Sequence, residues 1–338
     1  MFSSHPSSAP STIPPAAPRY RPGPHRVALL AAALTLPLLF VGGSVTSYGV
    51  GMAVPDWPTT FGANMFLYNF WNAPFGVQLE HSHRLFGSAV GLATITLTVW
   101  LLAFDRRRSM KVFGLVALAA VIVQGVMGGL RVSQISTTLA AVHGCFAQAF
   151  FGLMVALCVL TGRVWQTAGP ARPDTGRLRV WALAALGLVY GQIVVGAWFR
   201  HLDWEFKTPL ALGPHIVLAV LVLGVAHAAA GRVKRAGDGA ALLLPSARAL
   251  AIAATLQVAL GLLALGLMLP LGGNPRPPTL WEAIARTAHQ TNGALLLATA
   301  VVLALRAFGH LGAAPAVGSP DPDRSESEPA PQAMGALT

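Results

Sequence analysis

The stretch QLEHSHRLFGSAVGLATITLTVWLLAF, residues 78–104, decides the fold class. After its polar start it is almost entirely apolar from residue 84 to 104, and about 20 such residues suffice for a helix to cross a bilayer. Similar apolar runs recur at 27–47, 112–131, 139–161, 179–199, 211–231, 248–270 and 283–308. The sequence therefore predicts an all-α integral membrane protein with eight transmembrane helices.

The composition and the placement of charge support this class. Hydrophobic residues make up 54% of the chain and charged residues only 10%, whereas soluble domains carry about 25% charged residues. The net charge of +11 comes from clusters on one side of the successive helices, and the opposite loop, 48–80, has no Lys or Arg. This is the positive-inside pattern, so we expect both termini in the cytoplasm, membrane lipid as surroundings and no nucleic acid partner.

The predicted helices divide into two four-helix bundles joined by a basic segment. Residues 1–26 are rich in Pro and Ser and predict a disordered tail; 27–161 form the N-terminal bundle, 162–178 a cytoplasmic linker, 179–308 the C-terminal bundle and 309–338 a second disordered tail. The two cysteines, Cys145 and Cys158, have no metal-like spacing and are read as packing residues.

A recurring motif suggests that the two bundles are repeats. Three predicted helices carry Gln-x-x-x-Gly, at Gln124–Gly128, Gln192–Gly196 and Gln257–Gly261, and the first helix has Leu39 and Gly43 in the corresponding place. Residues four apart share one helix face. The motif also fits ordinary close packing and interhelical hydrogen bonding, so its recurrence carries the argument for a duplicated four-helix unit.

Each of the other four predicted helices carries one histidine near its outer end: His83, His143, His215 and His289. A single histidine in a membrane helix is often only a hydrogen-bonding residue, but four at matched depth point to function. Two histidines facing each other across a bundle are a usual way to hold a haem iron, whereas zinc prefers four ligands. A small residue follows each histidine by four positions, at Gly87, Ala147, Ala219 and Gly293, which leaves room for a flat macrocycle.

Four arginines lie at the outer helix ends, where the positive-inside rule disfavours them: Arg84, Arg131, Arg200 and Arg286. Haem carries two propionates, and arginine is a bidentate partner of carboxylates, so we expect these residues to help bind haem. Snorkelling to lipid headgroups is the alternative for each of them.

The carboxylate of Glu80 distinguishes the N-terminal histidine pair from the C-terminal pair. It precedes His83 by three residues and shares its helix face, while the positions before the other histidines hold Ala140, Leu212 and Arg286. A site of proton-coupled chemistry would need such a group, and a mere electron carrier would not. The alternative is a weak, solvent-exposed salt bridge from Glu80 to Arg84. His81 is expected to point away from this face.

Five segments together resemble the haem A synthase family: GMAVPDWPTT (51–60), EHSHRLFG (80–87), GGLRVSQISTTLAAVHGCFAQAFF (128–151), GAWFRH (196–201) and AHQTNGALLLATAV (288–301). The resemblance spans all eight predicted helices. It implies an oxidoreductase that converts haem O to haem A by successive hydroxylations of one porphyrin methyl, giving the formyl group used by haem-copper oxidases.

The resemblance also implies roles for individual residues. His215 and His289 would hold a haem b cofactor, His83 and His143 would take the haem O substrate, and Glu80 would be functionally important. Some family members have a cysteine pair in the first outer loop, and residues 48–80 have none, so the chain is similar to the cysteine-free branch. The implied location is the bacterial inner membrane. The implied partners are an electron donor, haem O synthase and oxidase assembly factors.

Two rival functions fit the same histidines. One is a dihaem b-type electron carrier that performs no chemistry on its haems. The other is a chaperone or transporter that delivers haem to the assembling oxidase. Haem extracted from cells that make haem O, with and without the protein, distinguishes the synthase from both.

Overall fold

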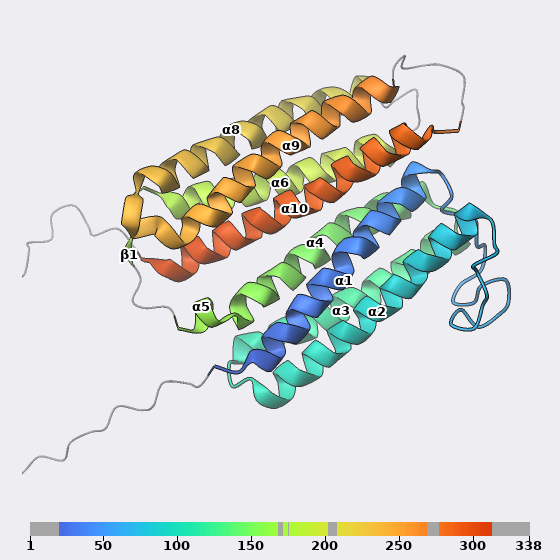
Figure 1. Cartoon of the computed structure of the whole chain (residues 1–338), viewed down its shortest axis with the longest axis horizontal. Helices are drawn as coiled ribbons and strands as arrows, with labels where there is room; N and C mark the ends of the chain where they lie inside the picture. The colour runs from blue at the N-terminus through green and yellow to red at the C-terminus, as the bar shows by residue number, and fades with distance from the viewer. Residues whose placement is uncertain (1–19, 168–171, 175, 202–207, 269–276, 313–338) are drawn as a thin grey trace, which may run out of the picture.

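The computed structural model describes residues 20–167, 172–174, 176–201, 208–268 and 277–312, and these are almost entirely helical (Figure 1). The first half of the chain contains α1 (Pro22–Ser47), α2 (Phe75–Phe104), α3 (Arg108–Ser133), α4 (Thr137–Thr161) and the short α5 (Arg163–Gln166). The second half contains α6 (Leu178–His201), α8 (Gly213–Arg235), α9 (Leu244–Met268) and α10 (Leu280–His310). A π-helical turn, η1 (Thr208–Leu212), precedes α8, and a 3-10 helix, η2 (Gly237–Leu243), precedes α9.

Within these described residues, eight helices are long and apolar enough to cross a membrane, which confirms the predicted all-α multi-span class. Large apolar side chains are exposed along the outer faces of the helices, such as Leu92, Ile252 and Leu262. In a helical membrane protein such faces lie against lipid tails, because the helices satisfy their own backbone hydrogen bonds.

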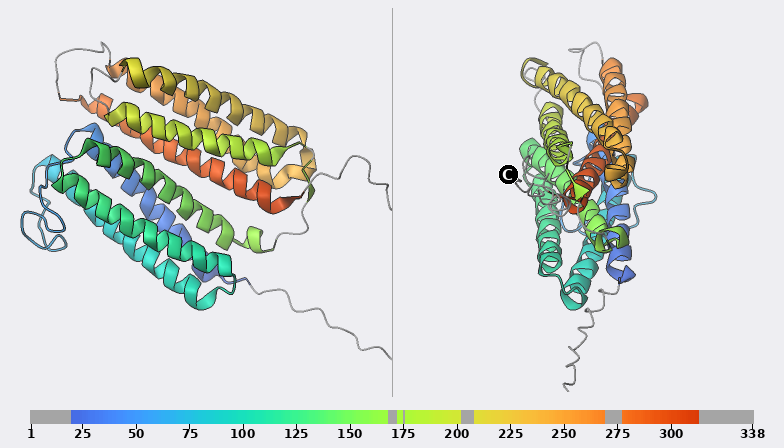
Figure 2. Two further views of the ribbon diagram at one scale, coloured as in Figure 1. Left: turned by 180° about the vertical axis from the view of Figure 1, so that it is seen from behind. Right: turned by 90° about the vertical axis from the view of Figure 1, so that its left-hand side faces the viewer.

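The eight long helices form two sets of four, each arranged as a ring of neighbours (Figures 1 and 2). In the N-terminal bundle α1 packs against α2 and α4, and α3 packs against the same two helices. In the C-terminal bundle α6 and α9 each pack against α8 and α10. The two bundles meet through α1, α4, α6 and α10. The shared order of neighbours supports the duplicated unit, which stays a prediction.

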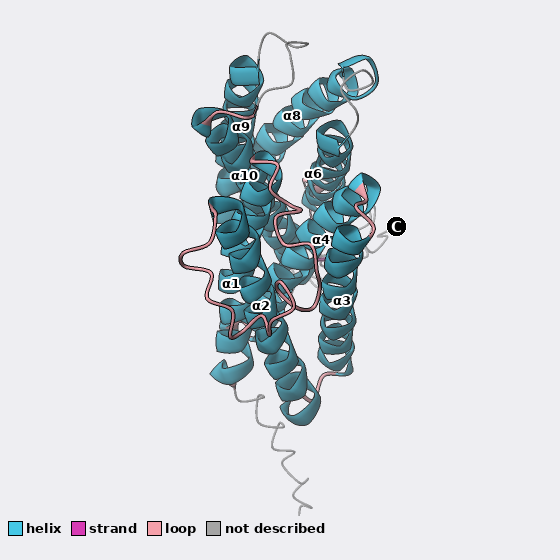
Figure 3. Cartoon of the chain, turned by 90° about the vertical axis from the view of Figure 1, so that its right-hand side faces the viewer, coloured by secondary structure: helices cyan, strands magenta, loops and turns pink. Residues whose placement is uncertain are grey.

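The buried apolar cores of both bundles lie toward the end where α1 begins and α10 finishes. The N-terminal core includes Leu97, Leu101 and Leu157, and the C-terminal core includes Leu250 and Leu303. The opposite end, which we call the loop end, carries the four predicted histidines and the cap loop, residues 48–74. Viewed from that end, the cap loop crosses the N-terminal bundle (Figure 3).

Several predicted boundaries differ from the structure. α2 begins at Phe75 rather than at residue 84, because the polar side chains of Glu80 and His81 are buried beneath the cap loop and the helix continues past its apolar run. α1 begins at Pro22, inside the predicted tail, and α6 continues to His201, past the predicted end of its apolar run at residue 199.

Short elements also occupy segments predicted to lack structure. In the predicted linker, β1 (Arg172–Pro173) pairs in parallel with β2 (Leu311–Gly312), which lies in the predicted second tail. The remaining parts of the predicted tails, 1–19 and 313–338, lie outside the described residues.

Candidate functional site

All four predicted histidines lie against a glycine of the preceding long helix. A Cβ added to the glycine would come within 2.8 Å of the histidine Cε1 at Gly42–His83, 3.2 Å at Gly128–His143, 2.9 Å at Gly196–His215 and 3.0 Å at Gly261–His289. Real Cβ atoms essentially never approach as closely as at Gly42 and Gly196, and at Gly128 and Gly261 the ring would have to move by a few tenths of an ångström, so each contact depends on the missing side chain. The imidazoles therefore rest directly on the backbone of a neighbouring helix.

These glycines explain the Gln-x-x-x-Gly motif, with one correction. Each lies within about the last two turns of its helix, so the four histidines have matched depth at the loop end. In α1 the glycine that contacts the histidine is Gly42, and the predicted counterpart, Gly43, faces Gln290 of α10. The sequence pattern missed this one-residue offset because α1 has no glutamine to mark the register.

The glutamine of each motif contacts the histidine that lies on the same glycine. Gln124 Nε2 donates to the His143 carbonyl oxygen at 3.3 Å, and Gln192 Nε2 donates to the His215 carbonyl oxygen at 3.0 Å. Gln257 Nε2 lies 3.2 Å from Nε2 and 3.3 Å from Nδ1 of the His289 ring. The motif is thus a cradle, in which glycine provides space and glutamine fixes the helix carrying the imidazole.

The histidines of each pair come from opposite corners of their bundle, α2 and α4 in one and α8 and α10 in the other. The ring centroids of His215 and His289 are 6.2 Å apart with an interplanar angle of 67°. Two imidazoles that share one metal ion place their centroids roughly 6 Å apart, because metal–nitrogen distances are about 2 Å. The C-terminal pair therefore has a spacing at which two imidazoles could share one iron.

The residues fit a haem better than a bare metal ion. A ring nitrogen of His83, of His143 and of His215 is buried without a hydrogen-bond partner, and buried polar atoms normally have one. In the described part of the chain, no three His, Cys, Asp or Glu side chains group together as metal ligands. Two histidines supply only two ligands to a metal ion, so the remaining ligands must come from elsewhere. A haem supplies them from its macrocycle, and the histidine pairs therefore match haem. Gly87, one turn beyond His83, has open space at its Cβ position.

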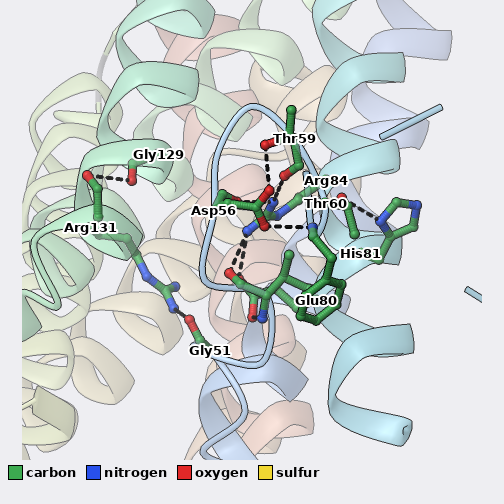
Figure 4. Close-up of polar contacts among 12 residues, drawn as sticks. Gly51, Asp56, Thr59, Thr60, Glu80, His81, Arg84, Gly129 and Arg131 are labelled. Carbon is green, nitrogen blue, oxygen red and sulfur yellow. Dashed lines mark hydrogen bonds and ion pairs between the residues drawn. The ribbon is translucent and has the colours of Figure 1, made fainter. Parts of the chain in front are cut away.

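Glu80 and Arg84 form a buried ion pair on α2, with Oε1 of Glu80 3.2 Å from Nη2 of Arg84 (Figure 4). The other carboxylate oxygen accepts a hydrogen bond from the Val54 amide at 3.1 Å. The Arg84 guanidinium donates to three cap-loop carbonyl groups, those of Val54, Asp56 and Thr59. The pair is therefore not the solvent-exposed salt bridge considered as the alternative, since it fastens the cap loop to α2.

His81 is a contact residue whose role the sequence did not reveal. As expected, it points away from the face of His83, and it is fully buried against the cap loop. Its Nδ1 lies 3.2 Å from Oγ1 of Thr60, and its ring packs against Tyr68 and Phe70 at 5.5 and 4.6 Å. The sequence offered one indication of this role. His81 cannot share the helix face of Glu80 and His83, and the aromatic residues of the preceding loop are the nearest partners for its ring.

Asp56 organises the tip of the cap loop. It accepts hydrogen bonds from the Thr59 hydroxyl and from the amides of Phe61 and Gly62. Burial alone would raise the pKa of Asp56, but these hydrogen bonds outweigh burial and lower the pKa from 3.8 to about 2. The carboxylate is therefore ionised at any physiological pH.

The other predicted arginines also lie at the loop end. Arg131 Nη2 donates to the Gly51 carbonyl oxygen at 2.8 Å, which ties α3 to the cap loop (Figure 4). Arg200 donates to groups on α1 and α10. Arg286 follows Glu282 by one turn of α10. The structure thus brings Glu80, Arg84 and Arg131 together around the cap loop and places Arg200 between the bundles.

Two four-helix sets with a cradled histidine pair in each define a multi-span membrane protein with two candidate haem sites. The model of the family described as "Cytochrome oxidase assembly protein" matches residues 64–212. Haem A synthase of Methylobacterium sp. (strain 4-46) is 27% identical over 351 residues, covering 85% of this chain and 92% of the relative. Over residues 64–212 the chain is similar to this family of cytochrome oxidase assembly proteins, and the similarity to this relative extends over most of the chain.

Two further relatives carry the same name. Haem A synthase of Methylorubrum extorquens is 27% identical over 374 residues, covering 90% of this chain and 92% of the relative. Haem A synthase of Exiguobacterium sibiricum is 30% identical over 185 residues, which is 52% of this chain. The alignment spans only 60% of that relative's own length.

Proposed function

We propose that this protein is a haem A synthase that oxidises one methyl group of haem O to a formyl group. The relatives of this name that align over most of the chain support the proposal. The observation that carries it is the asymmetry of the two histidine pairs: among the described residues, only the N-terminal pair has a buried carboxylate, Glu80, within one helical turn of a ligand histidine. Glu282, which is also buried, lies about two turns before His289 and caps the start of α10.

In this proposal the N-terminal pair, His83 and His143, holds the haem O substrate. Gly42 and Gly128 orient the two imidazoles from behind, and the cap loop excludes water from the loop end of the bundle. Glu80 accepts or donates a proton close to the reacting methyl group. A carboxylate has about four lone-pair sites, so the contacts to Val54 and Arg84 leave capacity for that proton.

The C-terminal pair, His215 and His289, holds haem b, which supplies redox chemistry when it is bound. The 6.2 Å centroid separation and the unpartnered His215 nitrogen support this assignment. Arg131 and Arg286 are the arginines proposed to meet propionates. For Arg84 and Arg200 we propose structural roles instead, because their guanidinium groups each donate to several protein acceptors.

The proposed setting is the bacterial inner membrane, with both termini on the cytoplasmic side. The basic residues Arg106 to Arg108, Arg163, Arg179 and Arg232 to Arg235 lie at the helix ends away from the loop end, as the positive-inside rule requires of a cytoplasmic face. A haem O synthase would supply the substrate, an electron-transfer partner would serve the oxidation, and oxidase assembly would consume the product.

The deciding experiment compares haems extracted from cells that make haem O, with and without this protein. We expect haem A, resolved by chromatography, only in cells that contain the protein. A dihaem electron carrier or a haem-delivery protein would leave haem O unchanged, so haem O without haem A in protein-containing cells would overturn the proposal.

A further inference from the structure

A buried polar cluster joins the two bundles at the loop end. Arg200 of α6 donates through Nη1 to Gln290 Oε1 at 2.8 Å and through Nη2 to the Gly43 carbonyl oxygen at 3.0 Å. The same Nη2 donates to Ser47 Oγ at 2.8 Å, and Thr287 Oγ1 donates to Ser47 Oγ at 2.9 Å. One guanidinium therefore links the first helix of the N-terminal bundle to two helices of the C-terminal bundle.

Two adjacent glycines of α1 connect this cluster to both histidine pairs. Gly42 lies against the His83 ring, while a Cβ at Gly43 would come within 3.0 Å of Gln290 Oε1. Gln290 directly follows His289 on α10. A shift of α1 relative to α10 would therefore disturb two contacts at once. One is between Gly42 and His83 of the substrate site, and the other is between Gly43 and Gln290, the residue beside His289 of the haem b site.

The surroundings make the cluster rigid. Leu39, Phe151 and Ala294 form a buried apolar contact among α1, α4 and α10 near the cluster. Ser47 and Thr287 are themselves buried, at 1% and 2% exposure. Hydrogen bonds of a charged group are strong in such a low-dielectric setting, and losing one acceptor leaves the charge poorly satisfied.

We propose that Arg200 is a positioning residue, a strut between the bundles that fixes the substrate-site histidines relative to the haem b site. This inference rests on the proposed function, since it takes both sites as that function assigns them. It replaces the sequence-based expectation that Arg200 binds a haem propionate, because three protein acceptors from α1 and α10 already surround its guanidinium.

The test uses full-length protein in lipid nanodiscs and three variants. Arg200→Gln removes the strut, and Ser47→Ala removes one of its acceptors without altering any charge. Arg179→Gln is the matched control, because Arg179 also lies on α6 and donates to α10 carbonyl groups, but at the opposite end of the helix. Zinc protoporphyrin serves as the unreactive probe of the substrate site.

Three quantities are measured: haem b per protein, the change in the haem b electron paramagnetic resonance spectrum on adding zinc protoporphyrin, and conversion of haem O. We expect Arg200→Gln and Ser47→Ala to keep haem b, to lose at least half of the spectral response shown by the wild type, and to convert haem O about 10- to 100-fold more slowly. A displacement of about 1 Å far from the chemistry can have an effect of this size. Arg179→Gln should match the wild type.

Two results would overturn the strut. Loss of haem b in Arg200→Gln would make Arg200 a cofactor-binding residue. An unchanged spectral response in both Arg200→Gln and Ser47→Ala would show that the sites do not communicate through the cluster. If the wild type and Arg179→Gln also lack haem b, the protein has no haem b site and the proposed function fails. If they keep haem b and only the role of Arg200 is contradicted, the proposed function stands and the strut alone is wrong.

Discussion

At the scale of single residues, the contact between an imidazole and a glycine one helix away occurs four times, and it decides where each imidazole can lie. A β-carbon at any of these glycines would push the ring by several tenths of an ångström or more. In the proposed function, ligation of a haem iron depends on ring position, so these glycines would control the histidine pairs without contacting the iron.

Gly196→Ala is therefore expected to weaken haem b binding at His215. Overpacking costs about 1–3 kcal/mol, and each 1.4 kcal/mol is a tenfold change in affinity, so we expect binding about tenfold weaker. Haem b per purified protein, titrated by its absorbance, measures this. Gly187→Ala on the same helix has open space at its Cβ position and should bind like the wild type. His215→Ala sets the lower limit, and equal binding by both glycine variants would contradict the cradle.

The Glu80 carboxylate holds the cap loop through Val54 and Arg84 and is proposed to transfer a proton, and substitution can separate the two roles. Glu80→Gln keeps an acceptor for the Val54 amide but loses the charge and the ability to take a proton. General acid–base help is worth about 10²–10⁴-fold, so the variant should retain haem b and accumulate haem O or the alcohol intermediate. Extracted haems provide the measurement.

Arg84→Gln is the matched comparison, since it releases the cap-loop carbonyl groups while leaving the carboxylate in place. If Glu80 acts by proton transfer, Arg84→Gln should lose less activity than Glu80→Gln. Equal losses would assign Glu80 to holding the cap loop, and wild-type haem A from Glu80→Gln would remove it from the reaction altogether.

At the scale of elements, the cap loop is held over the N-terminal bundle by contacts with two helices, α2 and α3, and by contacts within the loop. Trp57 packs against Gly129 of α3, where a Cβ would come within 2.4 Å of the indole ring. Arg131 of α3 and Arg84 of α2 hold its backbone, and Asp56 holds its tip. These contacts give the loop a fixed shape over the N-terminal pair.

The Asp56 pKa of about 2 predicts how this shape depends on pH. A lowered pKa means that the folded loop binds protons less readily than the unfolded loop, so the stabilisation is complete above pH 3.8 and is lost as the pH falls toward 2. Hydrogen exchange of the Phe61 and Gly62 amides, normalised to intrinsic rates, should rise only in that interval. Asp56→Asn should exchange faster at neutral pH and show no such step; a step that persists in it would assign the pH dependence to another group.

How well each helix could be predicted from the sequence depends on what covers it in the structure. Apolar runs predict a helix wherever lipid or core covers it, so each of the eight spans was found. The start of α2 was missed because its polar residues Glu80 and His81 are buried by the folding back of the preceding cap loop, and hydropathy along the helix does not show this. The histidines could be predicted from their depth, whereas the destinations of Arg84 and Arg200 depend on tertiary contacts.

At the scale of the whole molecule, the charge distribution predicts the orientation in the membrane. A cytoplasmic reporter enzyme fused after Thr167 should be active, and one inserted at Asn64 in the cap loop should be inactive there. A periplasmic reporter at the same two positions should give the opposite pattern. Activity of the cytoplasmic reporter at Asn64 would place the histidine pairs toward the cytoplasm.

The contact between α1 and α10 has a consequence for biogenesis. The ribosome makes α1 first and α10 last among the spanning helices, yet the two pack together and share the Ser47–Thr287 hydrogen bond. Until α6 and α10 are inserted, the buried hydroxyl of Ser47 lacks the two partners that it has in the folded protein, Arg200 and Thr287. The interface between the two bundles, including the cluster around Arg200, therefore forms only after the last spanning helix of the C-terminal bundle has been inserted.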